Sequence, residues 1–249
     1  DIDRVAFKAE GGNQRIPEAM ANSLEGEVHL GKTVVGIRTS KSDVAVHCQD
    51  GSVYRAAHVV CSLPIPTMRW VKFDPLLPPQ KAKAIQTVPV QKITKVIMVP
   101  KKPFWDDDGL SPAMWTDSDA GEIRALREGG DANEVTCLMA WARGYLADRL
   151  DTLGSVDAMQ RVVAEYERLR PAAKGQLEPA GVKSWQIDPF SGGDWAVWAP
   201  NQVTEALPAL IEPANRIHFC GEHTATTNRG MEGAMESADR VLGEMLNLI

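Results

Sequence analysis

The segment that decides the fold reads Arg216-Ile217-His218-Phe219-Cys220-Gly221-Glu222-His223-Thr224, and Gly230-Met231-Glu232-Gly233-Ala234 follows it closely. Its first five residues predict a strand. From Met231 onward the apolar residues recur at the spacing of one helix face, which predicts a long amphipathic helix. The unpaired N–H groups and positive dipole end at the start of such a helix favour an anion or an electron-rich ring. The segment therefore predicts a strand–glycine–helix unit with a candidate binding site at the head of its helix.

The rest of the chain predicts a mixed α/β fold of short strands and helices. Asp50-Gly51 predicts a hairpin turn. The prolines of residues 64–79 predict a break in regular structure and a boundary between domains. Helices are expected from Ile16, after Ser155 and from Met231 to the end. Strands are expected at 28–30, 33–39, 44–49, 52–56, 58–63, 91–99, 113–116, 134–142, 182–187 and 216–220.

Composition excludes two classes of protein. The 249 residues carry 27 basic and 33 acidic side chains, a net charge of −6. Nucleic-acid binding requires clustered Lys and Arg, which this chain lacks. No apolar run approaches the roughly 18 residues of a membrane-spanning helix. We expect no metal site and no signal peptide, and we favour the cytoplasm. Because the first residue is Asp1 rather than Met, we expect processing or a split gene.

Two glycine patterns bear on nucleotide binding. Residues 26–33 match the phosphate-binding G-x-x-x-x-G-K-[ST] loop, but such a loop must follow a strand and open a helix. Here the sequence continues as a predicted strand, so the match is interpreted as accidental. Among the 20 glycines no two are separated by a single residue, so the dinucleotide fingerprint G-x-G-x-x-G does not occur. If a dinucleotide binds, its pyrophosphate loop lies outside this chain.

Lys95 is the one amine on an otherwise apolar strand face. In the predicted strand at 91–99, Ile93, Ile97 and Val99 share its face. An edge-strand or snorkelling lysine is one interpretation. The alternative is a buried lysine retained for chemistry, because burial of its charge is costly and lowers its pKa.

Four separated signatures together resemble the flavin-dependent amine oxidase family, which includes monoamine, polyamine and L-amino-acid oxidases. They occur in the family's order across the whole chain, but they cover only the carboxy-terminal half of the usual family chain. The signatures are residues 11–17 (GGNQRIP), Lys95 ahead of Pro103-Phe104-Trp105, Phe190-Ser191-Gly192-Gly193-Asp194-Trp195, and residues 219–224 with 230–234.

The resemblance implies an FAD site. Val34 matches the position whose backbone meets the adenine, and Gly221-Glu222 match the loop beside the ribityl-phosphate region. Met231 matches the residue whose backbone N–H faces the flavin pyrimidine oxygen, where the helix dipole stabilises the reduced ring. Asp194 stands where mitochondrial monoamine oxidases attach flavin through a cysteine, so the FAD is expected to be noncovalent.

The resemblance also implies a catalytic site. Lys95 matches the lysine that holds a water near flavin N5, where a dry site with one proton-holding group suits oxidation of a neutral amine. Trp195 matches one wall of the aromatic cage around the substrate amine. Gly230 stands where the opposite wall is often aromatic, which leaves the cage half open for a bulkier substrate. Arg229, next to it, is a candidate for binding a substrate carboxylate, or a surface arginine. His223 is interpreted as structural.

The resemblance implies two domains: residues 1–84 with 188–249 as part of a Rossmann-like FAD-binding domain, and 85–187 as a sheet-and-helix substrate domain. The expected reaction is oxidative deamination of an amine to an imine, then to an aldehyde, with O₂ reduced to H₂O₂. We expect activity only in a hetero-oligomer with a companion polypeptide that carries the G-x-G-x-x-G half. Two alternatives stay open: an L-amino-acid oxidase of the same fold, and a noncatalytic fragment retained for assembly.

Overall fold

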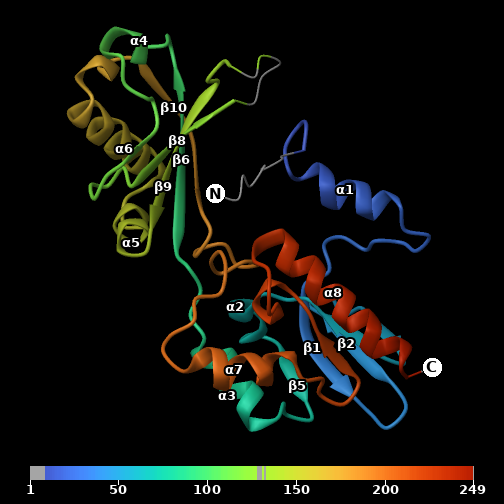
Figure 1. The fold of residues 1–249 in the computed structure, drawn as a ribbon. Helices are drawn as coiled ribbons and strands as arrows, with labels where there is room; N and C mark the ends of the chain where they lie inside the picture. The colour runs from blue at the N-terminus through green and yellow to red at the C-terminus, as the bar shows by residue number, and fades with distance from the viewer. Residues whose placement is uncertain (1–8, 128–130, 132, 249) are drawn as a thin grey trace. The chain divides into compact units, whose positions relative to one another are not determined.

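The computed structural model describes residues 9–127, 131 and 133–248 (Figure 1). The chain forms two compact units. Of the described residues, the first unit holds those within 9–31, 96–140 and 159–181, and the second holds those within 32–95, 141–158 and 182–248. These units are defined by packing alone, so the functional division into residues 1–84 with 188–249 and residues 85–187 stays a prediction.

The second unit contains a four-stranded sheet in the order β3-β2-β1-β5. Its first three strands form an antiparallel meander, whereas β5 pairs with β1 in parallel. The Asp50-Gly51 turn between β2 and β3 confirms the predicted hairpin, with Gly51 at a φ of 86°. The strands are β1 (Val34–Thr39), β2 (Val44–Cys48), β3 (Val53–Ala56) and β5 (Lys72–Asp74).

A second sheet of the same unit has only two strands, which run parallel: β4 (Val59–Cys61) and β11 (Ile217–Phe219). Helices α3 and α7 lie side by side (Figure 1). Apolar side chains from the helices and both sheets, among them Ile37, Ile65 and Phe219, form one buried core. The helices of this part are α2 (Ile65–Met68), α3 (Pro79–Thr87), α7 (Gln202–Ile211), the 3₁₀ turn η2 (Glu222–Thr224) and α8 (Gly230–Leu246).

A five-stranded sheet has the order β10-β6-β9-β8-β7. Its strands β6, β9 and β10 continue along the chain from one unit into the other. In the first unit the Tyr166 hydroxyl donates to the Pro112 carbonyl over 2.7 Å. The strands are β6 (Ile93–Pro100), β7 (Met114–Trp115), β8 (Glu122–Leu126), β9 (Cys137–Arg143) and β10 (Leu177–Ser184), and the remaining helices are α1 (Arg15–Asn22), α4 (Trp105–Asp108), α5 (Tyr145–Asp151), α6 (Ser155–Leu169) and η1 (Pro171–Ala173).

Three sequence-based expectations were wrong. Residues 28–30 form no strand, because they are exposed and pair with no other segment of the described chain. Residues 64–79 were expected to break regular structure, but they hold α2 and β5, and β5 completes the sheet of β1. The domain boundary expected in this segment stays a prediction. The strand expected at 182–187 lies earlier, as β10. In the part of the chain that the structure describes, no helix is long and apolar enough to cross a membrane.

The structure also rejects the phosphate-loop match. The residue after it begins β1 rather than a helix, so no helix N-terminus faces the loop. Lys32, the lysine of the match, instead pairs with Asp50 at 2.6 Å. Both residues belong to the β1–β3 meander, where this ion pair ties the start of β1 to the hairpin turn.

Candidate active site

Lys95 lies in the interior of a sheet. Its strand β6 has β10 on one side and β9 on the other, so the edge-strand interpretation is wrong. The neighbours Thr94 and Val96 point to the opposite face and are buried, whereas Lys95 is half-buried. Its Nζ lies 4.9 Å from the ring centre of Trp141, in cation–π range. Lys95 therefore places an accessible amine against an aromatic wall, and it is not the fully buried lysine of the other interpretation.

The Trp141 ring beside this amine belongs to a cluster with Trp195 and Arg143. The rings of Trp141 and Trp195 meet edge to face, with centres 6.1 Å apart and an angle of 78°. The guanidinium carbon of Arg143 lies 4.3 Å from the ring centre of Trp141 and 6.0 Å from that of Trp195. Sequence reasoning missed Trp141 and Arg143. The signal was present: β9 alternates buried and half-buried residues, and these two share its half-buried face.

A glycine pair fixes the position of Trp195. The Asp194 N–H donates to the Gln91 carbonyl at 2.9 Å, and the Gln91 N–H donates to the Trp195 carbonyl at 2.8 Å. A Cβ on Gly193 would lie 2.4 Å from Cγ2 of Val90, so only glycine allows the loop to approach this closely. The loop after β10 is thereby held against the chain that leads into β6 and Lys95.

Two carboxyl groups lie beside the aromatic pair. Burial raises the pKa of Asp194, against the opposing charges of Lys95 and Arg143. Burial likewise raises the pKa of Glu222, and the nearby charge of Asp194 adds to that rise. Glu222 accepts a hydrogen bond from the N–H of Ala196 at 3.2 Å. The structure therefore joins the glycine loop of Asp194 and Trp195 to the η2 loop of Gly221 and Glu222.

The η2 loop is built around a glycine. Gly221 has a φ of 121°, and a Cβ there would lie 2.6 Å from Cε1 of His223. Its N–H donates to the Ser237 hydroxyl at 2.8 Å, which anchors the loop on α8. Burial lowers the pKa of His223 to about 4, with the charge of Lys81 as a second cause. His223 is therefore neutral near pH 7, and its buried Nε2 has no hydrogen-bond partner in the described structure.

The head of α8 presents N–H groups to the outside. No side chain of the described residues caps this helix at Arg229, so its first-turn N–H groups are left for an external acceptor. Gly230 has a φ of 58° with open space around it, and Met231 follows it on the surface. The preceding connection is fixed separately, because Glu236 accepts hydrogen bonds from the N–H groups of Thr226, Thr227 and Asn228.

These residues fit the flavin that the resemblance implies. The uncapped head of α8 offers backbone donors, and the orphaned Nε2 of His223 adds a buried polar atom in the loop of Gly221. Val34, the predicted adenine contact, begins β1 of the four-stranded sheet, opposite Cys48. The roles assigned to Val34, Lys95, Asp194, Trp195, Gly221, Glu222, Gly230 and Met231 stay predictions.

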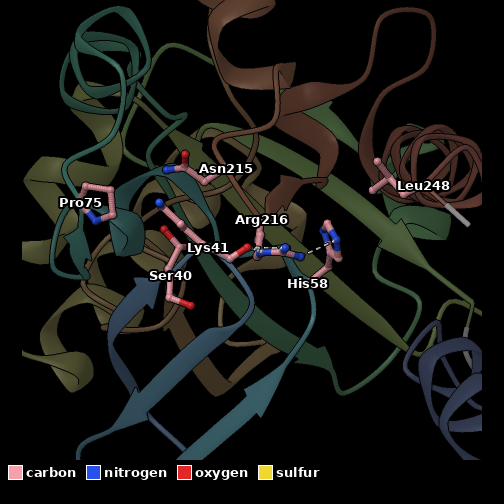
Figure 2. A pocket seen from close by; sticks show the side chains of 8 residues that line it. Ser40, Lys41, His58, Pro75, Asn215, Arg216 and Leu248 are labelled. Atoms are coloured by element: carbon pink, nitrogen blue, oxygen red, sulfur yellow. Dashed lines mark hydrogen bonds between the residues drawn. The ribbon is translucent and has the colours of Figure 1, made fainter.

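A separate pocket of about 780 Å³ lies at the other end of the β4–β11 pair (Figure 2). Arg216 donates to the Lys41 carbonyl at 2.6 Å and contacts Nε2 of His58 at 3.2 Å. From there Nδ1 of His58 lies 3.2 Å from Nε2 of His218, and Nδ1 of His218 lies 3.0 Å from Glu244. None of the predicted site residues lines this pocket.

Comparisons with known proteins agree with the resemblance to flavin-dependent amine oxidases. The family model described as flavin containing amine oxidoreductase matches residues 2–246. An L-amino-acid oxidase of Bothrops moojeni is 26% identical over 239 residues, which are 92% of this chain and 47% of the relative. That of Demansia vestigiata is 26% identical over 235 residues, 91% and 46% of the two chains. The chain thus spans about half the length of the curated relatives it matches.

Solved structures show the same fold. A variant of putrescine oxidase superposes with a TM-score of 0.84 at 22% identity, over 96% of this chain and 54% of that one. Cyclohexylamine oxidase from Brevibacterium oxydans superposes with a TM-score of 0.77 at 20% identity, over 94% and 52%. Because the family model covers nearly every residue, the chain belongs to the flavin containing amine oxidoreductase family.

Proposed function

We propose that the protein containing this chain oxidises an amine to an imine, which water hydrolyses to a carbonyl compound, with O₂ reduced to H₂O₂. The observation that carries this proposal is the placement of the Lys95 amine on Trp141, whose ring meets Trp195 edge to face. FAD, when bound, supplies the two-electron acceptor that passes electrons from the substrate to O₂. The chain's own residues bind and orient the amine and control its proton.

Three side chains divide this work. The rings of Trp141 and Trp195 form an apolar wall that excludes water from one side of the substrate. Lys95 holds a water molecule at its Nζ beside this wall. A positive charge at Lys95 also disfavours a substrate ammonium and favours the neutral amine, which is the form that is oxidised. We propose no catalytic side chain at Gly230, where the missing aromatic leaves room for a bulky substituent.

The glycine-rich dinucleotide loop is supplied by residues outside these 249. The chain offers the loop of Gly221 and Glu222 and the head of α8, but its sequence has no G-x-G-x-x-G. We propose a companion polypeptide that carries this fingerprint and forms a hetero-oligomer with the chain. Expression of the chain alone is then expected to give no stoichiometric flavin and no turnover. An isolated chain that binds flavin stoichiometrically and turns over amines would overturn the proposal of a companion polypeptide.

The FAD of this site is noncovalent. Asp194 occupies the position at which the covalent relatives carry a cysteine, and a carboxyl group has no sulfur with which to form the thioether bond. Acid precipitation of the flavin-loaded protein is expected to release all yellow colour into the supernatant. Colour that stays with the precipitated polypeptide would show a covalent bond and refute this part of the proposal.

The reaction itself is tested by peroxide release. The flavin-loaded protein is mixed with aliphatic amines, aromatic amines and L-amino acids in separate reactions, and H₂O₂ is measured together with flavin bleaching under anaerobic conditions. Bleaching by at least one amine-bearing substrate class, followed by peroxide on admission of O₂, is expected. A flavin that no amine or amino acid bleaches would favour the noncatalytic assembly fragment.

An L-amino acid is the second candidate substrate. Arg143 places a permanent positive charge 4.3 Å from the Trp141 ring centre, where it can pair with a substrate carboxylate while the amine meets Lys95. The Bothrops and Demansia relatives are named L-amino-acid oxidases. If this candidate is correct, Arg143→Met raises KM for amino acids at least about tenfold and leaves KM for amines unchanged. Arg149→Met, an exposed arginine on α5, is the matched control.

A further inference from the structure

We propose that the pocket of Figure 2 is a binding site for a small dianion of the phosphate-monoester class, held by Arg216 and Lys41 beside His58. None of the residues that line it is assigned to the flavin or to the substrate, so this inference does not depend on the proposed oxidase reaction. Three observations carry it: an arginine without a counter-ion, a lining without acidic side chains, and a framework that fixes the arginine in place.

The first observation is the unbalanced charge of Arg216. This side chain is half-buried, and it forms no ion pair with any carboxylate in the part of the chain that the structure describes. Its guanidinium contacts the carbonyls of Lys41 and Ala57, at 2.6 and 3.1 Å, and the imidazole of His58. These partners satisfy its hydrogen bonds but not its charge. A partly desolvated charge is costly unless an anion compensates it, so this site favours an anion from outside the chain.

The second observation is the basic lining of the pocket. Lys41 adds a second, exposed cation, and none of the described lining residues is Asp or Glu. Asp74 adjoins the lining in sequence, but it pairs with Arg38 at 2.8 Å. Positive charge is therefore concentrated here in a chain whose net charge is −6. A concave surface of one sign raises the local concentration of ions of the opposite sign.

Asp43 is the carboxylate whose charge reaches Arg216, and its own neighbours already bind it. Hydrogen bonds from Ser40 and Arg55 lower the pKa of Asp43, and the charge of Arg216 adds to this effect. The Arg55 guanidinium lies 2.8 Å from the Asp43 carboxylate. Asp43 does not line the pocket, so it leaves the positive charge there uncompensated.

The third observation is the framework around Arg216. Ala214 and Ile217 exchange backbone hydrogen bonds at 2.9 and 3.0 Å, which places Arg216 in a tight turn. Its Nε and Nη2 both donate to the carbonyl of Lys41, which ties this turn to the one between β1 and β2. Four of the five guanidinium N–H groups are used in the contacts described, and one on Nη2 is left for a ligand. Because the arginine is already fixed, little conformational entropy is lost on binding.

The charges and the size of the pocket favour a phosphate-bearing small molecule. The volume of about 780 Å³ lies in the range of small-molecule sites. Two fixed cations match a phosphate monoester, which carries nearly two negative charges near pH 7 and several acceptor oxygens. The hydroxyl of Thr39 and the amide of Asn215 also line the pocket and can donate to such oxygens. A single carboxylate would leave one of the two cations uncompensated.

His58 makes this site sensitive to pH. Partial burial lowers the pKa of His58, and the charges of Arg216 and His218 lower it further. Lys41 lines the same pocket, and Glu244 of α8 faces His218 from behind at 3.0 Å. A bound dianion opposes the repulsion between His58 and Arg216, so it raises the pKa of His58. Binding is therefore expected to tighten as the pH falls from 8 to 6.

Calorimetric titration of the flavin-loaded protein with sulfate tests the site. Sulfate keeps its two charges at both pH 6 and pH 8, and bound flavin keeps the predicted FAD residues occupied. At constant ionic strength we expect one saturable site that binds sulfate at least about threefold more tightly at pH 6, with inorganic phosphate binding similarly at pH 8 and acetate at least about tenfold more weakly. Absence of saturable sulfate binding would overturn the inference, and acetate binding as tight as that of sulfate would refute a dianion.

Matched variants locate the bound sulfate. Lys41→Met and Arg216→Gln are each expected to weaken sulfate binding at least about tenfold. Lys83→Met and Arg149→Met remove exposed cations outside the pocket and are expected to leave the affinity within about twofold. Because the Lys41 side chain is exposed, its variant keeps the test valid if the Arg216 variant does not fold. Equal weakening in all four variants would mean that net charge alone attracts sulfate, which would refute the site.

Histidine NMR on the unaltered protein gives a further test. The imidazole signal that disappears in His58→Gln reports the pKa of His58. Saturating sulfate is expected to raise this pKa by at least about half a unit. A pKa of His58 that does not change when sulfate binds would place the anion elsewhere and overturn the inference.

Discussion

Two lysines of the second unit each rest on an aromatic ring, and their surroundings differ in every other respect. Lys81 on α3 is 1% exposed, and its Nζ lies 3.8 Å from the ring centre of Phe219. That Nζ donates to the Leu210 carbonyl at 2.8 Å, which closes it off from any ligand. Lys95 lies on the half-buried face of β6, beside Trp141 and within the electrostatic reach of Asp194. Burial alone therefore does not identify the amine that can do chemistry; access to it does.

The largest expected effect separates the two lysines by activity. Lys95→Met is expected to slow flavin reduction about a thousandfold, because it removes the proton-holding group at the aromatic wall. Lys81→Met is expected to leave that rate within about twofold, since no ligand reaches Lys81. Lys92→Met, immediately before the same strand, is a second control, because Lys92 is exposed and pairs with Asp148 at 2.8 Å. Anaerobic stopped-flow bleaching measures all three.

Equal rates of flavin reduction in the Lys95→Met variant and the unaltered protein would contradict this distinction between the two lysines. They would assign Lys95 a structural role like that of Lys81, and they would favour the noncatalytic assembly fragment over the oxidase.

The next effect concerns stability and pH. Burial lowers the pKa of Lys81 from 10.5 to about 8, although Glu212 and Cys61 oppose the shift. Between these values the unfolded chain binds a proton at Lys81 that the folded chain does not, so the free energy of unfolding rises with pH across this window. The rise attributable to Lys81 is at most about 3 kcal/mol.

Denaturant unfolding of the flavin-loaded protein at pH 8 and pH 10 measures this effect, with Lys81→Met for comparison. The difference in unfolding free energy between the two proteins isolates Lys81 from Cys61, whose thiol pKa burial raises to about 11. A difference that stays constant from pH 8 to pH 10 would mean that Lys81 keeps an ordinary pKa.

The smallest expected effect lies in the loop that holds Trp195 near Lys95. Gly193→Ala is expected to cost about 2 kcal/mol of stability and to slow flavin reduction, because its Cβ would overlap Val90 and push the loop away from β6. Gly181→Ala is the matched control, since a Cβ there meets no atom within 4 Å. Equal melting temperatures for the two alanine variants would show that the loop accommodates the methyl group.

The sequence predicted the elements whose signals are local. The β1–β3 meander follows from alternation and the Asp50-Gly51 turn, and α8 follows from its apolar spacing. Helix α7 was missed, because Pro208 interrupts its pattern. Strand β8 was missed because Glu122 and Arg124 make it look polar, although the two pair with each other at 2.7 Å. Residues 28–30 are the opposite case. Their pattern predicted a strand, but they form none because no other strand of the described chain pairs with them.

The site residues also fall into two groups: those that local motifs predict and those that only strand pairing brings together. Lys95, Asp194 and Trp195 were found from motifs that lie within short stretches of sequence. Trp141 and Arg143 come from the strand beside β6, and only the pairing of β6 with β9 brings them to Lys95. The alternation in β9 puts these two residues on one strand face, but a single sequence does not show which strand lies beside that face. The burial of Lys81 was missed for the same reason, because α7 and β11 supply its surroundings.

His58, which lines the pocket of Figure 2, and its neighbour His218 have only one arrangement of protons that satisfies all their hydrogen-bond partners. Arg216 can only donate, so Nε2 of His58 accepts and its Nδ1 carries the hydrogen. That hydrogen goes to Nε2 of His218, whose Nδ1 then donates to the Glu244 carboxylate. Every donor thus points the same way, from Arg216 to Glu244. Both imidazoles are therefore held as a single tautomer, and adding a proton to His58 would turn an acceptor toward Arg216 into a second donor.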